Sequence, residues 1–242
     1  MLEAALKWLI AYLAGSLMGA LLVGRLKGVD IRELGSGNAG GTNALRTQGK
    51  AFALGVVVID VAKGWFAAGV LPGLALPWLA AIDPNYAASP DTIPVEWLAA
   101  GCAAAAVVGH VFPVWYDFRG GKGAATVIGA LLGLAPTLVL PALGVWLVMA
   151  CLTGYVGLST TVAMATLPFL AAYTGKPTAT LVLVSALAVF VAWAHRSNFA
   201  RMRAGTENRA RKIWLLGRLK SGAASASDST PSHPSSDSSA NR

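Results

Sequence analysis

The stretch that decides the fold is A-A-T-V-I-G-A-L-L-G-L-A-P-T-L-V-L-P-A-L-G-V-W-L-V-M-A-C, from Ala124 to Cys151. It holds no charged residue over 28 positions. Because a helix needs about 20 mostly apolar residues to cross a bilayer, this stretch is too long for one ordinary span. Proline interrupts helices, so we expect two short helices that meet near Pro136.

Similar apolar runs recur on both sides of this stretch. The chain of 242 residues is 55% hydrophobic and 12% charged, and a soluble domain carries roughly twice that charged fraction. The sequence therefore predicts an all-α, polytopic helical membrane protein with about seven transmembrane helices, or five if the later short helices are re-entrant. Besides the two short helices, the expected spans are residues 4–23, 51–71, 95–111, 158–173 and 179–194.

Three polar segments separate the spans, at residues 24–50, 112–123 and 195–220, and the alternation of spans puts all three on one face. They hold most of the positive charge, which totals +8 for the chain. Because positive residues favour the cytoplasmic side, we expect a cytoplasmic C-terminus and an external N-terminus. Such a hydrophobic chain argues against a nucleic-acid partner. The residues that decide the orientation are Arg25, Lys27, Arg32, Arg46, Lys50, Arg119, Lys122, Arg196, Arg201, Arg203, Arg209, Arg211 and Lys212.

The domain organisation follows from the same pattern. Residues 1–212 form the expected integral-membrane domain. Residues 213–242 are first basic and then Ser-rich, with no apolar pattern, and we expect a disordered cytoplasmic tail. No cofactor and no metal site is predicted, since Cys102 and Cys151 have no partners at metal-ligand spacing.

The first polar segment contains G-S-G-N-A-G-G-T-N-A-L-R, from Gly35 to Arg46. Consecutive glycines let backbone N–H groups converge into a nest for phosphate oxygens. Arg46 adds a planar fork that can hold a phosphate through two bonds. The alternative is a loop that only reverses the chain. The candidate binding residues are Ser36, Gly37, Asn38, Gly40, Thr42, Asn43 and Arg46.

The second polar segment is F-P-V-W-Y-D-F-R-G-G-K-G, from Phe112 to Gly123. It lacks the earlier glycine and the following Ser or Thr of a Walker A loop, so it does not indicate ATP binding. Its candidate residues Gly120, Gly121, Lys122 and Gly123 suit a second anion nest with one point charge. An equally good alternative is a positive anchor at the start of a helix.

The third polar segment contains H-R-S-N-F-A-R-M-R-A-G-T-E-N-R, from His195 to Arg209. His195 and Asn198 share a helix face because they are three residues apart. A histidine here could bind phosphate or transfer a proton, although an interfacial residue is the more common case.

Three further ionisable residues stand near these segments. We expect Asp60 and Lys63 at the cytoplasmic end of the second span, either as a functional pair or as a structural ion pair. His110 ends the third span beside the second glycine-rich segment, where it could support that segment.

Together, the three segments resemble the three motifs of the bacterial acyl-phosphate:glycerol-3-phosphate acyltransferase family, and D-V-A-K-G at 60–64 is similar too. The resemblance covers residues 2 to about 212. It implies acyl transfer from acyl phosphate to the 1-hydroxyl of glycerol 3-phosphate, as the first committed step of phospholipid synthesis in the bacterial inner membrane. It also implies a cytoplasm-facing site and transient contact with the peripheral enzyme that makes acyl phosphate.

The resemblance further assigns roles to residues. Ser36 and Arg46 would serve the site directly, and residues 120–123 would shape the binding of glycerol 3-phosphate. His195 and Asn198 would support activity, whereas Glu207 looks structural. The acceptor of the hydroxyl proton stays open between His195 and a substrate phosphate oxygen.

Two other functions compete with this one. A transporter for phosphate or a phosphorylated metabolite would place polar groups near the bilayer midplane in both halves of a repeat, and the sequence shows neither. A membrane adaptor without chemistry would leave the glycine-rich segments unexplained. Other glycerolipid acyltransferases carry a His and an Asp separated by four intervening residues. That pair is absent here, because Trp115 and Ala200 stand at this spacing from His110 and His195.

Overall fold

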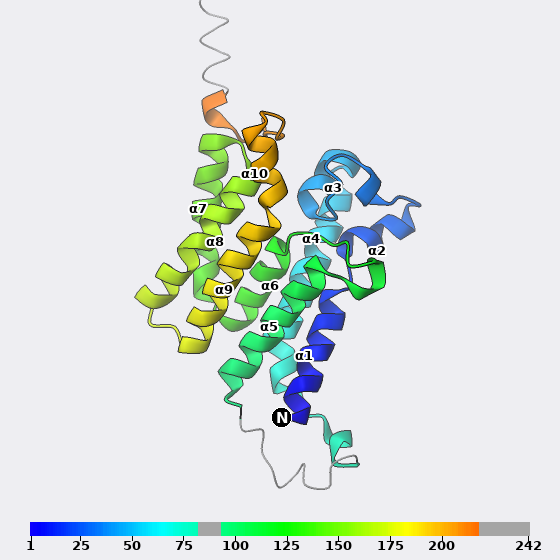
Figure 1. Cartoon of the computed structure of the whole chain (residues 1–242), viewed down its shortest axis with the longest axis vertical. Coiled ribbons are helices and arrows are strands. Elements are labelled where there is room, and N and C mark those ends of the chain that lie inside the picture. Colours follow the sequence, from blue (N-terminus) through cyan, green and yellow to red (C-terminus); the bar gives the residue numbers. More distant parts are fainter. Residues whose placement is uncertain (82–92, 218–242) are drawn as a thin grey trace, which may run out of the picture.

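The computed structural model describes residues 1–81 and 93–217, and within those residues every regular element is a helix (Figure 1). The expected all-α fold is therefore confirmed. The predicted disordered tail covers residues 213–242. Its first five residues are described, and Trp214 Nε1 donates to the carbonyl of Leu152 at 3.2 Å. The rest of the tail, from residue 218 onward, lies outside the described residues.

The first apolar run, predicted as one span over residues 4–23, is broken into two helices. Helix α1 covers Leu2–Gly15 and α2 covers Gly19–Leu26, and the two are bent by 45°. Met18 between them has extended backbone angles. The break is stable because side chains of another helix bond the backbone groups that it frees, as described below.

The second span places its ion pair deeper than expected. Helix α4, Lys50–Trp65, continues through a π turn, Phe66–Val70, into a 3-10 turn, Leu71–Gly73, and forms one 24-residue apolar stretch. Asp60 and Lys63 therefore lie near its middle and not at the cytoplasmic end, which corrects the prediction. Short elements flank this span: a 3-10 turn at Ile31–Glu33, α3 at Gly41–Gln48 and a 3-10 turn at Pro77–Ala81.

The stretch from 124 to 151 divides into two helices near Pro136, as the sequence predicts. Helix α6 covers Ala124–Leu134, a 3-10 turn follows at Pro136–Leu138, and α7 covers Val139–Thr153. With 11 residues, α6 rises roughly 16 Å, which is about half of the hydrocarbon thickness.

The remaining helices complete the bundle. They are α5 at Val95–Val111, α8 at Val156–Tyr173, α9 at Thr178–Ala194 and α10 at Arg196–Arg203. Among the described residues, four helices are long and apolar enough to cross a membrane, and six if each bent pair counts as one span. Only the short α6 would bring this to seven, so the count of seven stays a prediction.

Glycines bring the helices into close contact. A Cβ atom at Gly109 of α5 would overlap the carbonyl of Tyr12 in α1, and one at Gly15 would overlap the backbone of α5. Likewise, a Cβ atom at Gly64 of α4 would overlap the backbone of α6, and one at Gly129 of α6 would overlap the backbone of α4. Such contacts are what small residues permit between helices in lipid, and they fix the ends of α4, α5 and α6 from which the polar segments emerge.

All three polar segments lie at the same end of the bundle, as expected from the sequence. In Figure 1, α2, α3 and α10 lie at the upper end, and the N-terminus and the turn between α8 and α9 lie at the lower end. The glycine-rich segments are therefore close enough to share one cavity.

Candidate active site

A cavity of about 530 Å³ opens where the polar segments meet. Most of its polar lining comes from those segments, and its apolar lining comes from α4, α6, α7 and α8. The polar lining includes Ser36, Asn38, Thr42, Asn43, Arg46, Lys122, His195, Asn198, Arg201 and Glu207. The apolar lining includes Leu54, Val57, Ile128, Leu131, Val139, Leu143, Trp146, Met164 and Leu167. The cavity is thus amphipathic, with charged groups beside a long apolar wall.

The first glycine-rich loop is held in shape by Asn43. Its Oδ1 accepts from the backbone N–H of Ser36 at 3.0 Å, and its Nδ2 donates to the carbonyls of Ile31 and Leu34 at 3.2 and 2.9 Å. Gly35 has a left-handed φ of 59°, which favours glycine. Both ends of the buried Asn43 amide are committed to the loop, so its side chain has little capacity left for a substrate.

Arg46 extends from α3 over the cavity. Helix α3 begins at Gly41, and Gly40, Gly41 and Thr42 at its amino end all line the cavity. The amino end of a helix favours an anion. The Arg46 side chain is exposed, and its Nη2 donates to the carbonyl of Asn208 at a long 3.4 Å. The guanidinium therefore has most of its donors available.

The second glycine-rich loop folds back onto the end of α5. The N–H of Gly120 donates to the carbonyl of Val111 at 3.2 Å, and that of Gly121 donates to the carbonyl of His110 at 3.1 Å. A Cβ atom at Gly120 would overlap these backbone carbonyls, and one at Gly121 would overlap the His110 ring. These glycines allow close packing, and the cavity lining includes Lys122 and Gly123 but not Gly120, Gly121 or Gly37.

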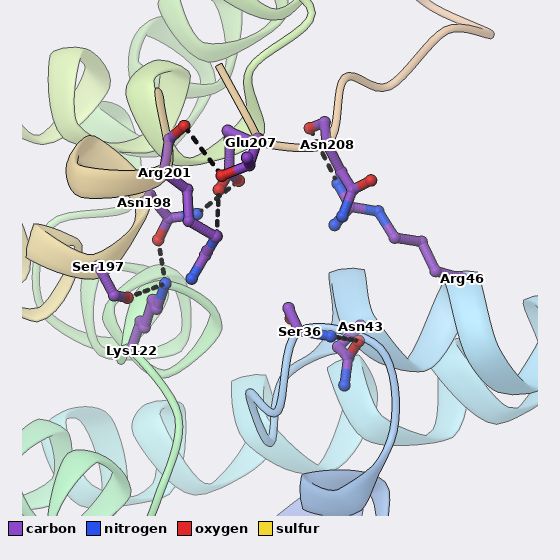
Figure 2. A network of polar contacts seen from close by, with 10 residues as sticks. Ser36, Asn43, Arg46, Lys122, Ser197, Asn198, Arg201, Glu207 and Asn208 are labelled. Atoms are coloured by element: carbon purple, nitrogen blue, oxygen red, sulfur yellow. Dashed lines mark hydrogen bonds and ion pairs between the residues drawn. The ribbon is translucent and has the colours of Figure 1, made fainter. Parts of the chain in front are cut away.

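Lys122 joins the second segment to the third. Its Nζ donates to Asn198 Oδ1 and lies 3.5 Å from Ser197 Oγ, as Figure 2 shows. Partial burial, followed by the like charge of Arg201, lowers the pKa of Lys122 to about 8. The ammonium is therefore largely protonated at neutral pH but is poorly solvated, and an anion would stabilise it.

The third segment holds its polar side chains through Glu207. Asn198 Nδ2 donates to Glu207 Oε1 at 2.8 Å, and Arg201 Nε donates to Glu207 Oε2 at 2.6 Å. Arg201 was not among the candidate site residues, although its spacing of three from Asn198 puts both on one helix face. Glu207 fixes the neighbours of Lys122 and is consistent with the structural role expected of it.

His195 ends α9 and is buried at the cavity wall. Its Nδ1 lies 2.8 Å from the carbonyl of Val191. A carbonyl only accepts, so this contact places the proton of the neutral ring on Nδ1. Nε2 is then the atom that can accept a proton.

Figure 2 shows the Lys122, Asn198, Arg201 and Glu207 cluster on one side and Arg46 on the other. Three cations, Arg46, Lys122 and Arg201, line the cavity together with two carboxylates, Glu207 and Asp60. Because Asp60 is paired with Lys63, an excess of positive charge remains around the polar lining. The arrangement suits a substrate with anionic groups and an apolar chain.

The fold and this cavity define the class as an all-helical integral membrane protein with a cationic, partly apolar binding site. The family model described as glycerol-3-phosphate acyltransferase matches residues 5–205. The chain belongs to the glycerol-3-phosphate acyltransferase family, and it is an acyltransferase of phospholipid synthesis.

Individual relatives agree with this assignment. The glycerol-3-phosphate acyltransferase of Agrobacterium fabrum is 43% identical over 206 residues, which are 85% of this chain and 91% of that protein. That of Synechococcus elongatus is 41% identical over 202 residues, or 83% and 91% of the two chains. The crystal structure of PlsY, an integral membrane glycerol 3-phosphate acyltransferase, in its glycerol 3-phosphate form superposes with a TM-score of 0.71 at 30% identity, covering 85% of this chain and 94% of that one.

Proposed function

We propose that the chain transfers an acyl group from acyl phosphate to the 1-hydroxyl of glycerol 3-phosphate, giving 1-acylglycerol 3-phosphate and phosphate. The observation that carries this proposal is the cavity in which Arg46 and Lys122 stand beside a long apolar wall. Both substrates carry phosphate and the donor also carries a hydrocarbon chain. One cationic and amphipathic cavity can hold them together.

The acceptor is supported by the relatives. They are named glycerol-3-phosphate acyltransferases, and PlsY has been crystallised in glycerol 3-phosphate and lysophosphatidic acid forms. In this chain we assign the two phosphate groups to the two sides of the polar lining, with Arg46 and Ser36 on one side and Lys122 and Asn198 on the other. The glycine-rich loops then bring the phosphates near each other, and the cations offset their repulsion.

The chemistry follows from this placement. The 1-hydroxyl oxygen attacks the acyl carbonyl carbon, the bond to the phosphate oxygen breaks, and phosphate leaves with the electron pair. Since acyl phosphate is already activated, orientation and charge stabilisation by Arg46 and Lys122 supply most of the catalysis. The hydroxyl proton passes either to His195 Nε2 or to a substrate phosphate oxygen.

The location of the site is part of the proposal. The polar segments carry most of the Lys and Arg residues, and by the positive-inside rule this supports a cytoplasmic position for them. The resemblance to the bacterial family supports the inner membrane as the location of the chain. We also propose a transient contact with the peripheral enzyme that makes acyl phosphate. A donor with a long hydrocarbon chain is poorly soluble, and such a contact would deliver it at the membrane surface.

The test is an assay of purified protein with acyl phosphate and labelled glycerol 3-phosphate, run with and without a chelator. We expect labelled lysophosphatidate in both conditions, without coenzyme A or acyl carrier protein. Acyl coenzyme A alone is the matched comparison. Equal activity with that thioester would overturn the donor assignment, and loss of activity with the chelator would contradict the metal-free mechanism.

A further inference from the structure

Helix α4 carries a buried ion pair to which the proposed mechanism gives no task. Lys63 Nζ lies 2.9 Å from Asp60 Oδ1, and the two side chains are 5% and 1% exposed. Ionisable groups at membrane depth are costly unless they are paired or serve a function. The contacts of this pair show which parts of the molecule it holds.

The pair bonds both ends of the break in the first span. Lys63 Nζ donates to the carbonyl of Leu17 at 2.8 Å, and Asp60 Oδ1 accepts from the N–H of Gly19 at 3.2 Å. A cation thus meets the carboxyl end of α1 and a carboxylate meets the amino end of α2, the arrangement that helix dipoles favour. Helix α2 leads into the first glycine-rich loop, so the pair sets the direction from which that loop starts.

His110 connects the same carboxylate to the second loop. Its Nδ1 lies 3.5 Å from Asp60 Oδ1, and the ring is 3% exposed. On the other side of the ring, Nε2 lies against Gly121, where a Cβ atom would overlap it. Gly121 is the residue before Lys122.

We propose that Asp60, Lys63 and His110 form a positioning unit that fixes the two glycine-rich loops relative to each other. The proposal rests on the proposed function, because the quantity that it controls is the placement of Lys122 against the phosphate of glycerol 3-phosphate. The unit acts through the start of α2 and through Gly121. It does not exchange a proton with the substrate.

The opposing explanation is direct chemistry, because Asp60 and His110 also line the cavity. The two explanations differ in kinetics. A proton acceptor acts in the transition state, so its loss lowers kcat and leaves the KM for glycerol 3-phosphate unchanged. A displaced Lys122 weakens the binding of the phosphate and raises that KM. Simple loss of folded protein lowers the apparent kcat without changing KM.

The first experiment compares His110→Asn with wild type. Asparagine keeps a donor toward Asp60 but removes the ring edge that contacts Gly121. We expect the KM for glycerol 3-phosphate to rise roughly tenfold while kcat falls by less than about threefold. An unchanged KM, with or without a large loss of kcat, would overturn the proposal.

A double-mutant cycle tests the contact itself. Gly121→Ala pushes against His110 and should raise the same KM. His110→Ala removes the ring atoms that give the shortest contact with the new methyl group, and of its three nearest atoms leaves only the carbonyl oxygen of Ala39, at 3.1 Å. The double variant should therefore show a smaller increase in KM than the product of the two single effects. Fully multiplicative effects would mean that the two residues act separately, and the proposal would fail.

The ion pair is tested with a neutral replacement. Asp60→Asn with Lys63→Gln keeps an acceptor for the Gly19 N–H and a donor for the Leu17 carbonyl, whereas Asp60→Asn alone leaves a buried unpaired ammonium. We expect the double variant to fold better than the single one and to retain acyl transfer. A well-folded double variant without activity would show that the carboxylate takes part in the reaction.

Failure of the donor assignment would not affect these tests. The KM for glycerol 3-phosphate is measured with whichever acyl donor the wild-type enzyme uses, and the cycle compares variants under that one condition.

Discussion

The two glycine-rich loops look alike in sequence but use their glycines differently. In the loop from Gly35 to Arg46, Gly35 and Gly37 have left-handed backbone angles and Asn43 holds the turn. In the second loop, Gly120 and Gly121 pack against the end of α5, and a side chain at either would collide with His110. Gly35 and Gly37 thus allow left-handed backbone angles, whereas Gly120 and Gly121 allow close packing. Gly123 at the end of the second loop also has a left-handed φ, of 84°.

This difference shows that the glycines of a loop and its cation can have separate roles. Each loop presents one cation to the cavity, Arg46 or Lys122. A row of glycines beside a cation therefore does not establish that the glycines bind the anion. In the second loop they bring the lysine into place.

Replacing the cation of the first loop should have the largest effect. Arg46→Ala removes a group placed for charge stabilisation, and we expect kcat to fall by roughly 10²–10³-fold. The steady-state rate of acyl transfer with saturating acyl phosphate measures this fall in kcat. The Arg46 side chain is exposed, so the amount of inserted protein should equal wild type, and near-normal turnover would remove Arg46 from the site.

Methyl groups added to the glycines should separate proximity from conformation. The methyl group of Gly120→Ala would overlap backbone carbonyls, and this overlap should lower the free energy of unfolding by about 3 kcal/mol. Gly28→Ala is the matched control, because Gly28 has a left-handed φ of 66° and no atom lies within 4 Å of the added carbon. This variant should lower the free energy of unfolding by only about 1 kcal/mol. Thermal unfolding in detergent compares them, and equal shifts would contradict the assignment of Gly120 to close packing.

The smallest expected effect is a pH dependence specific to the second loop. With a pKa of about 8, Lys122 is charged below that pH and neutral above it. The kcat/KM for glycerol 3-phosphate should then fall about tenfold per pH unit above pH 8, because kcat/KM reports groups of the free enzyme. Lys122→Arg stays charged and should remove this fall, and an identical pH profile in that variant would exclude Lys122 as its source.

Much of the fold could be predicted because apolar length and proline are local signals. The division near Pro136, the helix from Val95 and the common end of the polar segments follow from them. The break at Ser16–Met18 could not be predicted. No proline marks it, and the groups that stabilise it, Asp60 and Lys63, are more than 40 positions away in the chain.

The sequence predicted which residues form the site better than it predicted how they are arranged. The sequence selected Ser36, Arg46, Lys122, His195 and Asn198, and the structure brings all five to one cavity. Residue type alone could not show that Asn43 bonds its own loop or that Gly120 and Gly121 are absent from the cavity lining. The first fact depends on how the loop folds around Asn43, and the second on the packing of the second loop against the end of α5.

The broken first span also has a consequence for how the protein enters the membrane. In hydrocarbon no water can bond the backbone groups freed between Gly15 and Gly19, and their partners belong to α4. During synthesis, α1 and α2 therefore cannot reach their final bend until α4 has been made. We expect biogenesis to treat the first two spans as one cooperative unit, in which the later helix completes the earlier one.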